Sequence, residues 1–376
     1  MYERIRQHGP VSRPQLAEVT GLSKPTISLA LADLERWKLV RAVGHRSGNA
    51  GRAAVLYEMR PEAGHVIAVD VGRAWIRLAL ANLAGEVLAR RTEPSQASSS
   101  PKLVAQISKR ARALAAEVGL DHRKITFTVI GSPGFVDPRS GTIRLAPNLA
   151  GWGHPGVLEA LAEQLGHEFV VENDVKLATL GEQAHGQGKG VASFAFVSIG
   201  TGIGMGIVID GRLYRGARGA AGEIGYLPLG EPDADTLTGV QRRGWLESVA
   251  AADGVVASAR RLGVEGAVTA KEVFEAARRG DPAAKEVVGI EAEHVARALA
   301  AVTSVIDPEL IVLGGGIGGN GELLIKPVEK RLRALLRVPA PRLVVSTLGD
   351  DAVVLGALAT ALTTARDQVF ERAVAG

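Results

Sequence analysis

The sequence predicts an α/β protein in which a small N-terminal module precedes a duplicated α/β body with two lobes. Three observations predict this class. Two short capped helices and two strands fit into residues 1–60. Strands alternate with helices after residue 61, and a strand, a glycine-rich turn and a return strand occur twice in that part. The chain has 376 residues, of which 46 % are hydrophobic and 22 % charged, so it can bury a core and is not globally disordered.

The composition excludes several kinds of chemistry and location. The chain has no cysteine, which excludes disulfides, thiolate metal ligands, cysteine nucleophiles and iron–sulfur clusters. No apolar run reaches the roughly 20 residues that a membrane-spanning helix needs. The polar start of the chain lacks the apolar region of a secretory signal. We therefore expect a cytoplasmic protein without a membrane partner.

The positive charge of the chain is concentrated at its N-terminus. The formal net charge is +4, and residues 1–60 hold ten Lys and Arg against five Asp and Glu. The remaining residues hold 34 basic and 35 acidic side chains. This distribution is typical of a small nucleic-acid-binding module on a neutral body, although a solvated basic face is the alternative.

Residues 12–34 predict two helices joined by a short turn. Ser12 can cap the first helix, in which Leu16 and Val19 form the buried stripe, and Gly21 ends it. Ser23 can cap the second helix. The buried stripe of that second helix consists of Ile27, Leu31 and Leu34. Two capped helices with a glycine in the turn are typical of a helix-turn-helix.

Two short strands, 39–43 and 53–59, follow these helices. The loop 44–52 between them has three glycines and two arginines, which is typical of a flexible basic wing that contacts DNA phosphates or the minor groove. A helical hairpin used for dimerisation is the alternative interpretation. The predicted DNA-binding residues are Ser12, Arg13, Lys24, Thr26, Ser28, Arg46 and Arg52. Leu29 and Ala30 leave the middle of the second helix poor in hydrogen-bond donors, so we expect limited direct base readout, with phosphate contacts and the wing contributing more.

The body contains three glycine-rich turns at strand ends. Strands are predicted at 65–70, 76–83, 86–91, 125–130, 169–172, 193–199, 207–210 and 310–313, with helices at 102–119 and 174–185. Glycine-rich turns at strand ends allow backbone N–H groups to converge on a phosphate. Tight hairpins also need glycine for steric reasons alone, so these turns favour a nucleotide-type site only moderately.

Motifs along the whole chain resemble those of the ROK family, which groups sugar-responsive repressors with sugar kinases. The matching stretches are 70–72 (DVG), 131–137 (GSPGFVD), 146–149 (APNL), 172–174 (END), 200–206 (GTGIGMG), 219–225 (GAAGEIG), 245–247 (WLE) and 307–316 (DPELIVLGGG). The resemblance implies an actin-like, hexokinase-like (ribonuclease H-like) fold of two lobes. We expect a winged helix-turn-helix at 1–60, a first lobe at 61–180 plus 350–376, and a larger second lobe at 181–349. The N-terminal module matches the repressor branch, since the plain kinases of the family lack it.

The resemblance also implies a sugar site. The residues that stand where the family places sugar contacts are Asn148, Asn173, Asp174, Glu223, Tyr226 and Glu247. Carboxylates and amides in a cleft can hold vicinal hydroxyls, and such a site rejects analogues that leave its polar groups unpaired. In the kinases, the residue matching Asp174 is the base that deprotonates the attacked hydroxyl. Taken alone, Asp174 would be interpreted as a helix N-cap.

Two departures from the family pattern argue against zinc and against kinase activity. The zinc histidine of the family corresponds to Tyr226, and the cysteine positions correspond to Thr238, Val240 and Trp245, so no metal site is predicted. The first phosphate turn of the kinases has glycine and threonine where this chain has Arg73 and Ala74. A vestigial nucleotide site would then consist of Asp70, Gly72, Gly200, Thr201, Gly202, Gly314 and Gly315. We expect no cofactor and no ATP requirement.

These observations together predict a non-catalytic, kinase-like sensor. We expect a DNA-binding regulator, acting as a repressor on a double-stranded operator, whose DNA affinity responds to a sugar or phosphosugar bound between the lobes. A homodimer or a dimer of dimers would match a two-fold operator. The alternative is an ATP-dependent sugar kinase with a DNA-binding appendage, and a third possibility is an assembly module with neither activity.

Overall fold

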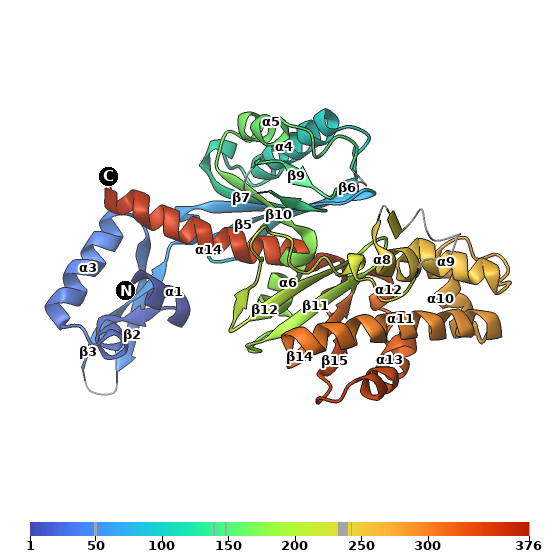
Figure 1. The fold of residues 1–376 in the computed structure, drawn as a ribbon. Coiled ribbons are helices and arrows are strands. Elements are labelled where there is room, and N and C mark those ends of the chain that lie inside the picture. The colour runs from blue at the N-terminus through green and yellow to red at the C-terminus, as the bar shows by residue number, and fades with distance from the viewer. Residues whose placement is uncertain (49–50, 138–139, 147–148, 232–239, 242, 376) are drawn as a thin grey trace.

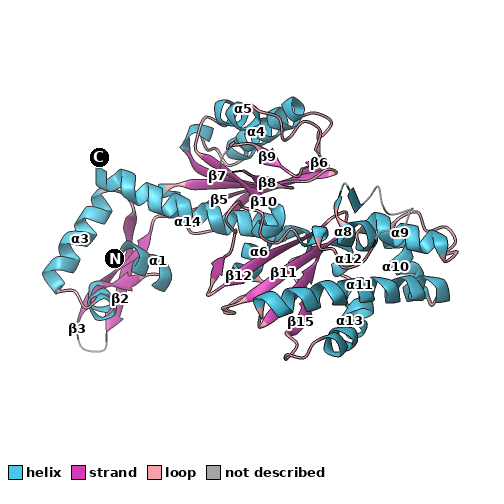
Figure 2. Cartoon of the chain, in the orientation of Figure 1, coloured by secondary structure: helices cyan, strands magenta, loops and turns pink. Residues whose placement is uncertain are grey.

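The computed structural model describes residues 1–48, 51–137, 140–146, 149–231, 240–241 and 243–375. The chain forms an N-terminal module followed by two α/β lobes, each built on a five-stranded sheet (Figures 1 and 2). We call the part around the sheet β10-β7-β4-β5-β6 the first lobe, and the part around the sheet β13-β12-β11-β14-β15 the second lobe. This is the α/β class that the alternating pattern predicts.

The N-terminal module is a set of three helices beside a small antiparallel sheet of order β1-β3-β2. Its elements are α1 (Tyr2–His8), β1 (Val11–Ser12), α2 (Arg13–Thr20), α3 (Lys24–Arg36), β2 (Val40–Gly48) and β3 (Gly51–Met59). Ser12 and Gln15 form a capping box on α2, and Gly21 ends that helix in the left-handed conformation, φ 69°. Ser23 caps α3. These local signals are confirmed.

The sequence prediction did not include α1 and β1, and two further details of this module differ from it. Val19 is 44 % exposed, so Leu16 alone is buried on α2. The wing is also shorter than predicted, because β2 continues to Gly48 and β3 starts at Gly51. The ladder continues through two register shifts, between Ala42 and Gly44 and between Arg46 and Gly48. Bulges of this kind absorb residues that would otherwise form a loop.

The first lobe has a mixed sheet with helices on both faces. Its strands are β4 (His65–Val71), β5 (Trp75–Asn82), β6 (Val87–Pro94), β7 (Ile125–Ser132) and β10 (Phe169–Asn173). Strands β10, β7 and β4 are parallel, whereas β4, β5 and β6 form an antiparallel meander. Alternate residues of β4 serve two cores: Ile67 and Val69 pack with α4 (Ser100–Glu117) and α5 (Val157–Leu165), and Val66 and Ala68 pack with α14 (Ala352–Ala375). The lobe also holds η1 (Pro61–Ala63), η2 (His122–Lys124), β8 (Phe135–Val136) and β9 (Ile143–Arg144).

The second lobe repeats this plan with more helices. Its strands are β11 (Phe194–Ile199), β12 (Ile203–Ile209), β13 (Arg212–Leu213), β14 (Leu310–Gly314) and β15 (Arg342–Val345). Its helices are η3 (Ile224–Tyr226), α8 (Trp245–Ala250), α9 (Ala252–Arg261), α10 (Ala270–Arg279), α11 (Pro282–Ile306), α12 (Gly315–Gly318) and α13 (Gly321–Leu335). The turn η4 (Gly349–Asp351) then leads into α14.

Two helices join the lobes and the module. Helix α6 (Asp174–His185) packs against β11 and β12 of the second lobe and against α14. The crossing of α6 and α14 is very close: a Cβ at Gly356 would stand 1.7 Å from the Leu177 carbonyl oxygen, and a Cβ at Gly181 would stand 2.3 Å from the Ala352 oxygen. Only glycine permits that approach. Figure 1 shows α14 (red) running from this crossing to the N-terminal module (blue).

The N-terminal module shares one apolar core with α14 and the first lobe. That core contains Tyr2, Ile27 and Leu31 of the module together with Leu358 and Ala361 of α14. Phe370 of α14 extends this contact, because its ring stacks on Tyr2 at 6.0 Å and meets Trp37 edge-on at 6.3 Å. The module is therefore packed onto the C-terminal helix rather than attached by its linker alone.

Candidate functional site

The first-lobe part of the candidate site lies where β10 ends and α6 begins. The Asn173 side chain accepts a hydrogen bond from the Lys176 amide (3.0 Å) and donates one to the Gly134 carbonyl (2.9 Å). Asn173 is therefore the N-cap of α6, and the interpretation of Asp174 as the cap is wrong. Asp174 is the first helical residue, and its Oδ1 accepts the Val175 amide at 2.8 Å. A carboxylate in the first turn suits the positive end of a helix.

The second-lobe part of the site comes from η3 and α8. Glu223 directly precedes η3, and Tyr226 ends it with 46 % of its surface exposed. Glu247 lies in the first turn of α8, and its Oε2 accepts the Ile203 amide at 2.9 Å. A Cβ at Gly202 would stand 3.0 Å from that oxygen, so the small residue lets the carboxylate approach the backbone.

The carboxyl groups of Asp174, Glu223 and Glu247, which we call the carboxyl cluster, influence one another across the two lobes. Burial raises the pKa of Asp174. Burial also raises the pKa of Glu223, with Asp174 and Glu247 adding to the rise and Lys176 opposing it. Burial and then the charge of Asp174 raise the pKa of Asp70 to about 7, against the effect of Arg77. Three of the predicted sugar residues, Asp174, Glu223 and Glu247, are therefore close enough for their charges to interact. Such groups can accept several hydroxyl hydrogen bonds.

Lys176 is a buried part of this site that the sequence analysis missed. It is 1 % exposed, and its Nζ donates to the Gly219 carbonyl. Burial lowers the pKa of this ammonium, whereas Glu172 and Glu223 raise it. A lysine within the otherwise largely apolar stretch 175–180 was the available signal. A buried cation beside carboxylates lowers the cost of holding their charges together.

A second contact between the two parts of the site lies beside that of Lys176 with Gly219. Arg215 donates to Glu172 Oε2 at 2.7 Å, and Glu172 Oε1 accepts the Asn173 amide at 3.0 Å. Arg215 and Gly219 belong to the segment between β13 and η3 that also leads to Glu223. The two parts of the site are thus tied together by the protein itself. Asn148, also predicted as a sugar contact, lies outside the described residues.

The first glycine turn does not present an open phosphate site. Asp70 is 7 % exposed and forms an ion pair with Arg77 at 3.1 Å, and Arg77 also binds Asp350 at 2.8 Å. The Gly72 amide donates to the Trp75 carbonyl within the turn. Arg73 is exposed at this turn. The acidic group that would face a nucleotide is therefore already engaged by an arginine.

The second glycine turn and the turn after β14 need glycine for packing. A Cβ at Gly315 (φ 80°) would stand 2.4 Å from the Ile199 carbonyl oxygen, and a Cβ at Gly314 would stand 2.6 Å from the Phe196 ring. The Gly200 amide donates to the Gly202 carbonyl, while Thr201 is exposed. These contacts account for Gly314 and Gly315 without a nucleotide.

The residues at the family's zinc positions do not fit zinc. Val240 packs against the second-lobe core, and Thr238 lies outside the described residues. Trp245 is 9 % exposed, faces Gly230, and meets His294 edge-on at 5.5 Å. Zinc needs nitrogen, sulfur or carboxylate ligands, which these side chains do not supply. Within the described ranges, no group of three or more acidic or histidine side chains is arranged to hold a metal.

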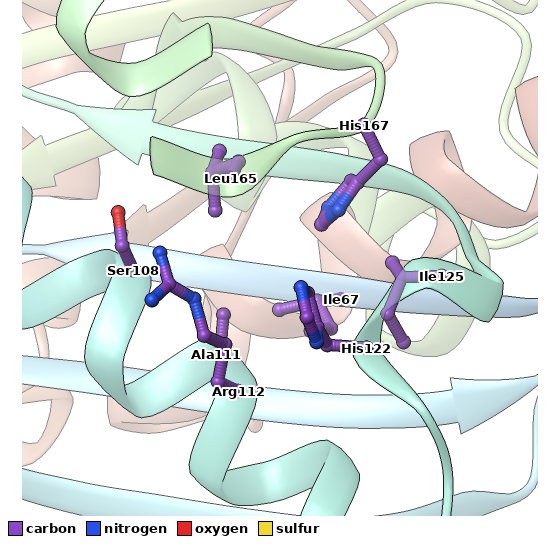
Figure 3. A pocket seen from close by; sticks show the side chains of 8 residues that line it. All are labelled: Ile67, Ser108, Ala111, Arg112, His122, Ile125, Leu165 and His167. Carbon is purple, nitrogen blue, oxygen red and sulfur yellow. The ribbon is translucent and has the colours of Figure 1, made fainter. Parts of the chain in front are cut away.

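Two indentations lie away from this site. The one in Figure 3, between α4, η2 and the end of α5, is lined by His122, His167 and Arg112 among others and has no room for a water molecule. The other, of about 300 Å³, is an open surface hollow beside Arg297 and Leu335. Neither includes a predicted site residue.

The candidate DNA surface is carried by α2 and α3. Lys24 and Ser28 are exposed on α3, and the Thr26 hydroxyl lies 2.8 Å from that of Ser23. Arg13 donates to the Tyr57 hydroxyl at 2.7 Å and lies over its ring. Ser12 is 5 % exposed and its hydroxyl caps α2, so its side chain faces the protein. The other two predicted DNA contacts, Arg46 and Arg52, have side chains outside the described part of the structure.

In comparisons with known proteins, the family model matches only the two lobes, whereas some relatives match nearly the whole chain. The model of the ROK family matches residues 66–364. A glucokinase of Halalkalibacterium halodurans is 32 % identical over 309 residues, covering 77 % of this chain and 92 % of that protein. The xylose repressor of Caldicellulosiruptor bescii is 25 % identical over 369 residues, covering 94 % of this chain and 92 % of that protein.

One solved structure extends the likeness over the whole chain. The crystal structure of a ROK family transcriptional regulator, a homolog of the Escherichia coli MLC protein, superimposes with a TM-score of 0.81. It is 24 % identical and covers 100 % of this chain and 97 % of that one, so it establishes the shared fold. None of the helices in the described ranges has the length and apolar character of a membrane span.

Proposed function

The chain belongs to the ROK family, and from this membership we propose that it is a transcription regulator whose affinity for operator DNA is set by a sugar. One observation carries the proposal. The helix that begins with Asp174 crosses α14 at Gly181 and Gly356, and α14 shares its apolar core with the N-terminal module. A continuous packed path therefore connects the candidate sugar site with the candidate DNA surface.

The proposed mechanism is a change in lobe closure. The sugar binds between the lobes through Asn173, Asp174, Glu223 and Glu247, with Tyr226 and Asn148 as further contacts. Closure moves α6 and α14 together, because their glycine crossing leaves no room for independent sliding. The module on α14 then changes its position relative to that of a second subunit. Sugar and DNA binding are thereby linked, and the linkage is reciprocal.

The carboxyl cluster favours a neutral polyol at the point where the lobes meet. Asp174, Glu223 and Glu247 accept hydroxyl hydrogen bonds, whereas a phosphate beside them would be repelled. If the effector is a phosphosugar, its phosphate must lie away from these groups. Arg73, exposed at the turn after Asp70, is the cation we assign to that end.

DNA binding is assigned to Lys24, Thr26, Ser28 and Arg13, with Arg46 and Arg52 on the wing. We propose a homodimer, or a dimer of dimers, that acts as a repressor. Its half-sites would lie about one helical turn, or a multiple of it, apart on the double-stranded operator. A dimer couples two modules, so a small rotation of each changes the fit to both half-sites.

The test is fluorescence anisotropy with labelled DNA from upstream of the protein's own gene, at fixed salt, with a panel of sugars and phosphosugars. We expect salt-sensitive binding that one sugar changes about 5–150-fold, the range of a coupling of about 1–3 kcal/mol. DNA binding that no sugar alters contradicts the sensor. Absence of DNA binding contradicts the regulator.

The second candidate function is an ATP-dependent sugar kinase with a DNA-binding appendage. The glucokinase relative and the retained turns at 200–206 and 314–316 favour it. Asp174 would then be the base, and its raised pKa would help it take a proton. The Arg77–Asp70 ion pair and the Arg73-Ala74 turn argue against it. Phosphotransfer from ATP to a sugar panel distinguishes the two functions.

A further inference from the structure

The outward face of α3 carries an apolar stripe that nothing in the described structure covers. The opposite face is buried, with Ile27 and Leu31 fully inaccessible. Pro25, Leu29 and Ala32 are all exposed and follow the spacing i, i+4, i+7, which places them on one side of the helix. Leu29 is 70 % exposed. Figure 1 shows α3 on the outer flank of the module, away from both lobes.

We ask which partner could contact this exposed apolar stripe. Single exposed apolar residues are ordinary, whereas these three share one face of the same helix. Polar residues border the stripe, with Lys24 and Thr26 at the helix start and Ser28 beside Leu29. The partner therefore combines apolar points with groups that accept hydrogen bonds or carry negative charge.

The positive charge of the module favours a negatively charged partner over a second copy of the module. Residues 1–60 carry ten basic and five acidic side chains, so a second copy of this face would bring like charge against like charge. Asp33, the acidic residue nearest to this face, is paired with Arg36 at 2.8 Å. Double-stranded DNA supplies the complementary charge. In its major groove, the apolar group that the bases present is the 5-methyl of thymine.

We propose that Leu29, flanked by Pro25 and Ala32, contacts thymine methyl groups in the major groove, so that α3 recognises its site by apolar contact as well as by hydrogen bonds. The inference rests on the proposed DNA-binding function and specifies the bases that are read. The first turns of a recognition helix are the part that reaches the base edges, which suits Pro25 and Leu29. Apolar contact thereby adds base discrimination to a helix centre that has few hydrogen-bond donors.

The test replaces single thymines by deoxyuridine, which removes the methyl and keeps the hydrogen-bonding groups of the base. The duplex is first selected from a random pool with the full-length protein. We expect one or two positions in each half-site at which uracil weakens binding about fourfold, the effect of one buried methyl or methylene group. Leu29→Ala weakens binding to the thymine duplex by a similar factor and removes the discrimination between thymine and uracil.

Two further variants are controls. Lys24→Ala should weaken binding to both duplexes equally and reduce the salt dependence, as loss of a phosphate contact does. Val305→Ala removes a side chain that is 85 % exposed on the second lobe and should change neither affinity. Circular dichroism and sedimentation of Leu29→Ala report its fold and its oligomeric state.

The outcomes separate this inference from the proposed function. If the wild-type protein selects no duplex, the DNA-binding function itself fails. If it binds DNA but uracil is neutral at every position, or if Leu29→Ala keeps the discrimination, DNA binding stands and the thymine contact is wrong. If Leu29→Ala changes the oligomeric state at unchanged DNA discrimination, the stripe is a protein interface.

Discussion

Replacing Phe370 by alanine should loosen the N-terminal module while leaving the lobes intact. The ring of Phe370 stacks on Tyr2 at 6.0 Å and meets Trp37 at 6.3 Å, and both partners belong to the module. Aromatic pairs contribute about 0.5–1.5 kcal/mol each beyond their buried area, so the two contacts together hold the module with about 1–3 kcal/mol. Native-state hydrogen exchange measures this directly as an opening free energy.

The expected result is faster amide exchange across residues 2–59, by about 5–150-fold, with unchanged exchange in β4 and β7. Val374→Ala is the matched control, because it truncates an apolar side chain of α14 that is 54 % exposed and has no ring partner. Unchanged exchange in the module would refute the role of α14 as its support. Uniformly faster exchange in both lobes would show that Phe370 stabilises the whole chain instead.

Three further predictions concern buried ionisable side chains. Asp174→Asn should weaken sugar binding about 10-fold or more in calorimetry, because a hydrogen bond to a charged group contributes about 1.5–3 kcal/mol; unchanged affinity would remove Asp174 from the site. Lys176→Met should raise the pKa of Glu223, since the opposing cation is lost, so that sugar affinity falls at a higher pH than in the wild type as the solution is acidified; superimposable pH profiles would contradict this. Glu291 is 2 % exposed, and burial raises its pKa well above 4.5. The native state therefore retains its proton, and the free energy of unfolding falls by up to about 1.4 kcal/mol per pH unit as the pH rises above the unfolded value. Glu291→Gln should flatten this dependence in urea unfolding between pH 5 and 8, and an equal slope in both proteins would refute the assignment.

Local signals in the sequence were sufficient for most of the fold. Capping residues and apolar spacing correctly placed α2, α3 and α6, because these signals act within one or two turns. Most strands of the two five-stranded sheets were also placed, but β13 and β15 were not predicted, and β12 begins at Ile203, inside the stretch predicted as a glycine-rich turn. The predicted wing was too long. Its glycine content suggested a loop, whereas bulges at 42–44 and 46–48 allow the strand ladder to continue. The prediction that Val19 is buried was wrong, since Leu16 is the buried residue of α2 and Val19 is 44 % exposed.

The candidate site was less predictable than the fold. Family motifs identified Asn148, Asn173, Asp174, Glu223, Tyr226 and Glu247. In the structure Asn173 contacts Asp174, and the charges of Asp174 and Glu247 act on Glu223. Two pairings could not be predicted from local patterns. Arg77 pairs with Asp70 on the neighbouring strand, and Lys176 pairs with the distant Gly219 carbonyl. The assignment of these residues to sugar binding, like the domain boundaries at 60, 180 and 350, stays a prediction.

The central claim is that the carboxyl cluster and the DNA surface are thermodynamically linked. The most direct measurement is the dissociation constant of the effector sugar, determined by calorimetry with the free protein and with the protein saturated by its operator. Linkage requires that DNA change the sugar constant by the same factor by which the sugar changes the DNA constant. We predict equal factors of about 5–150. A sugar constant that is identical with and without DNA would contradict the account.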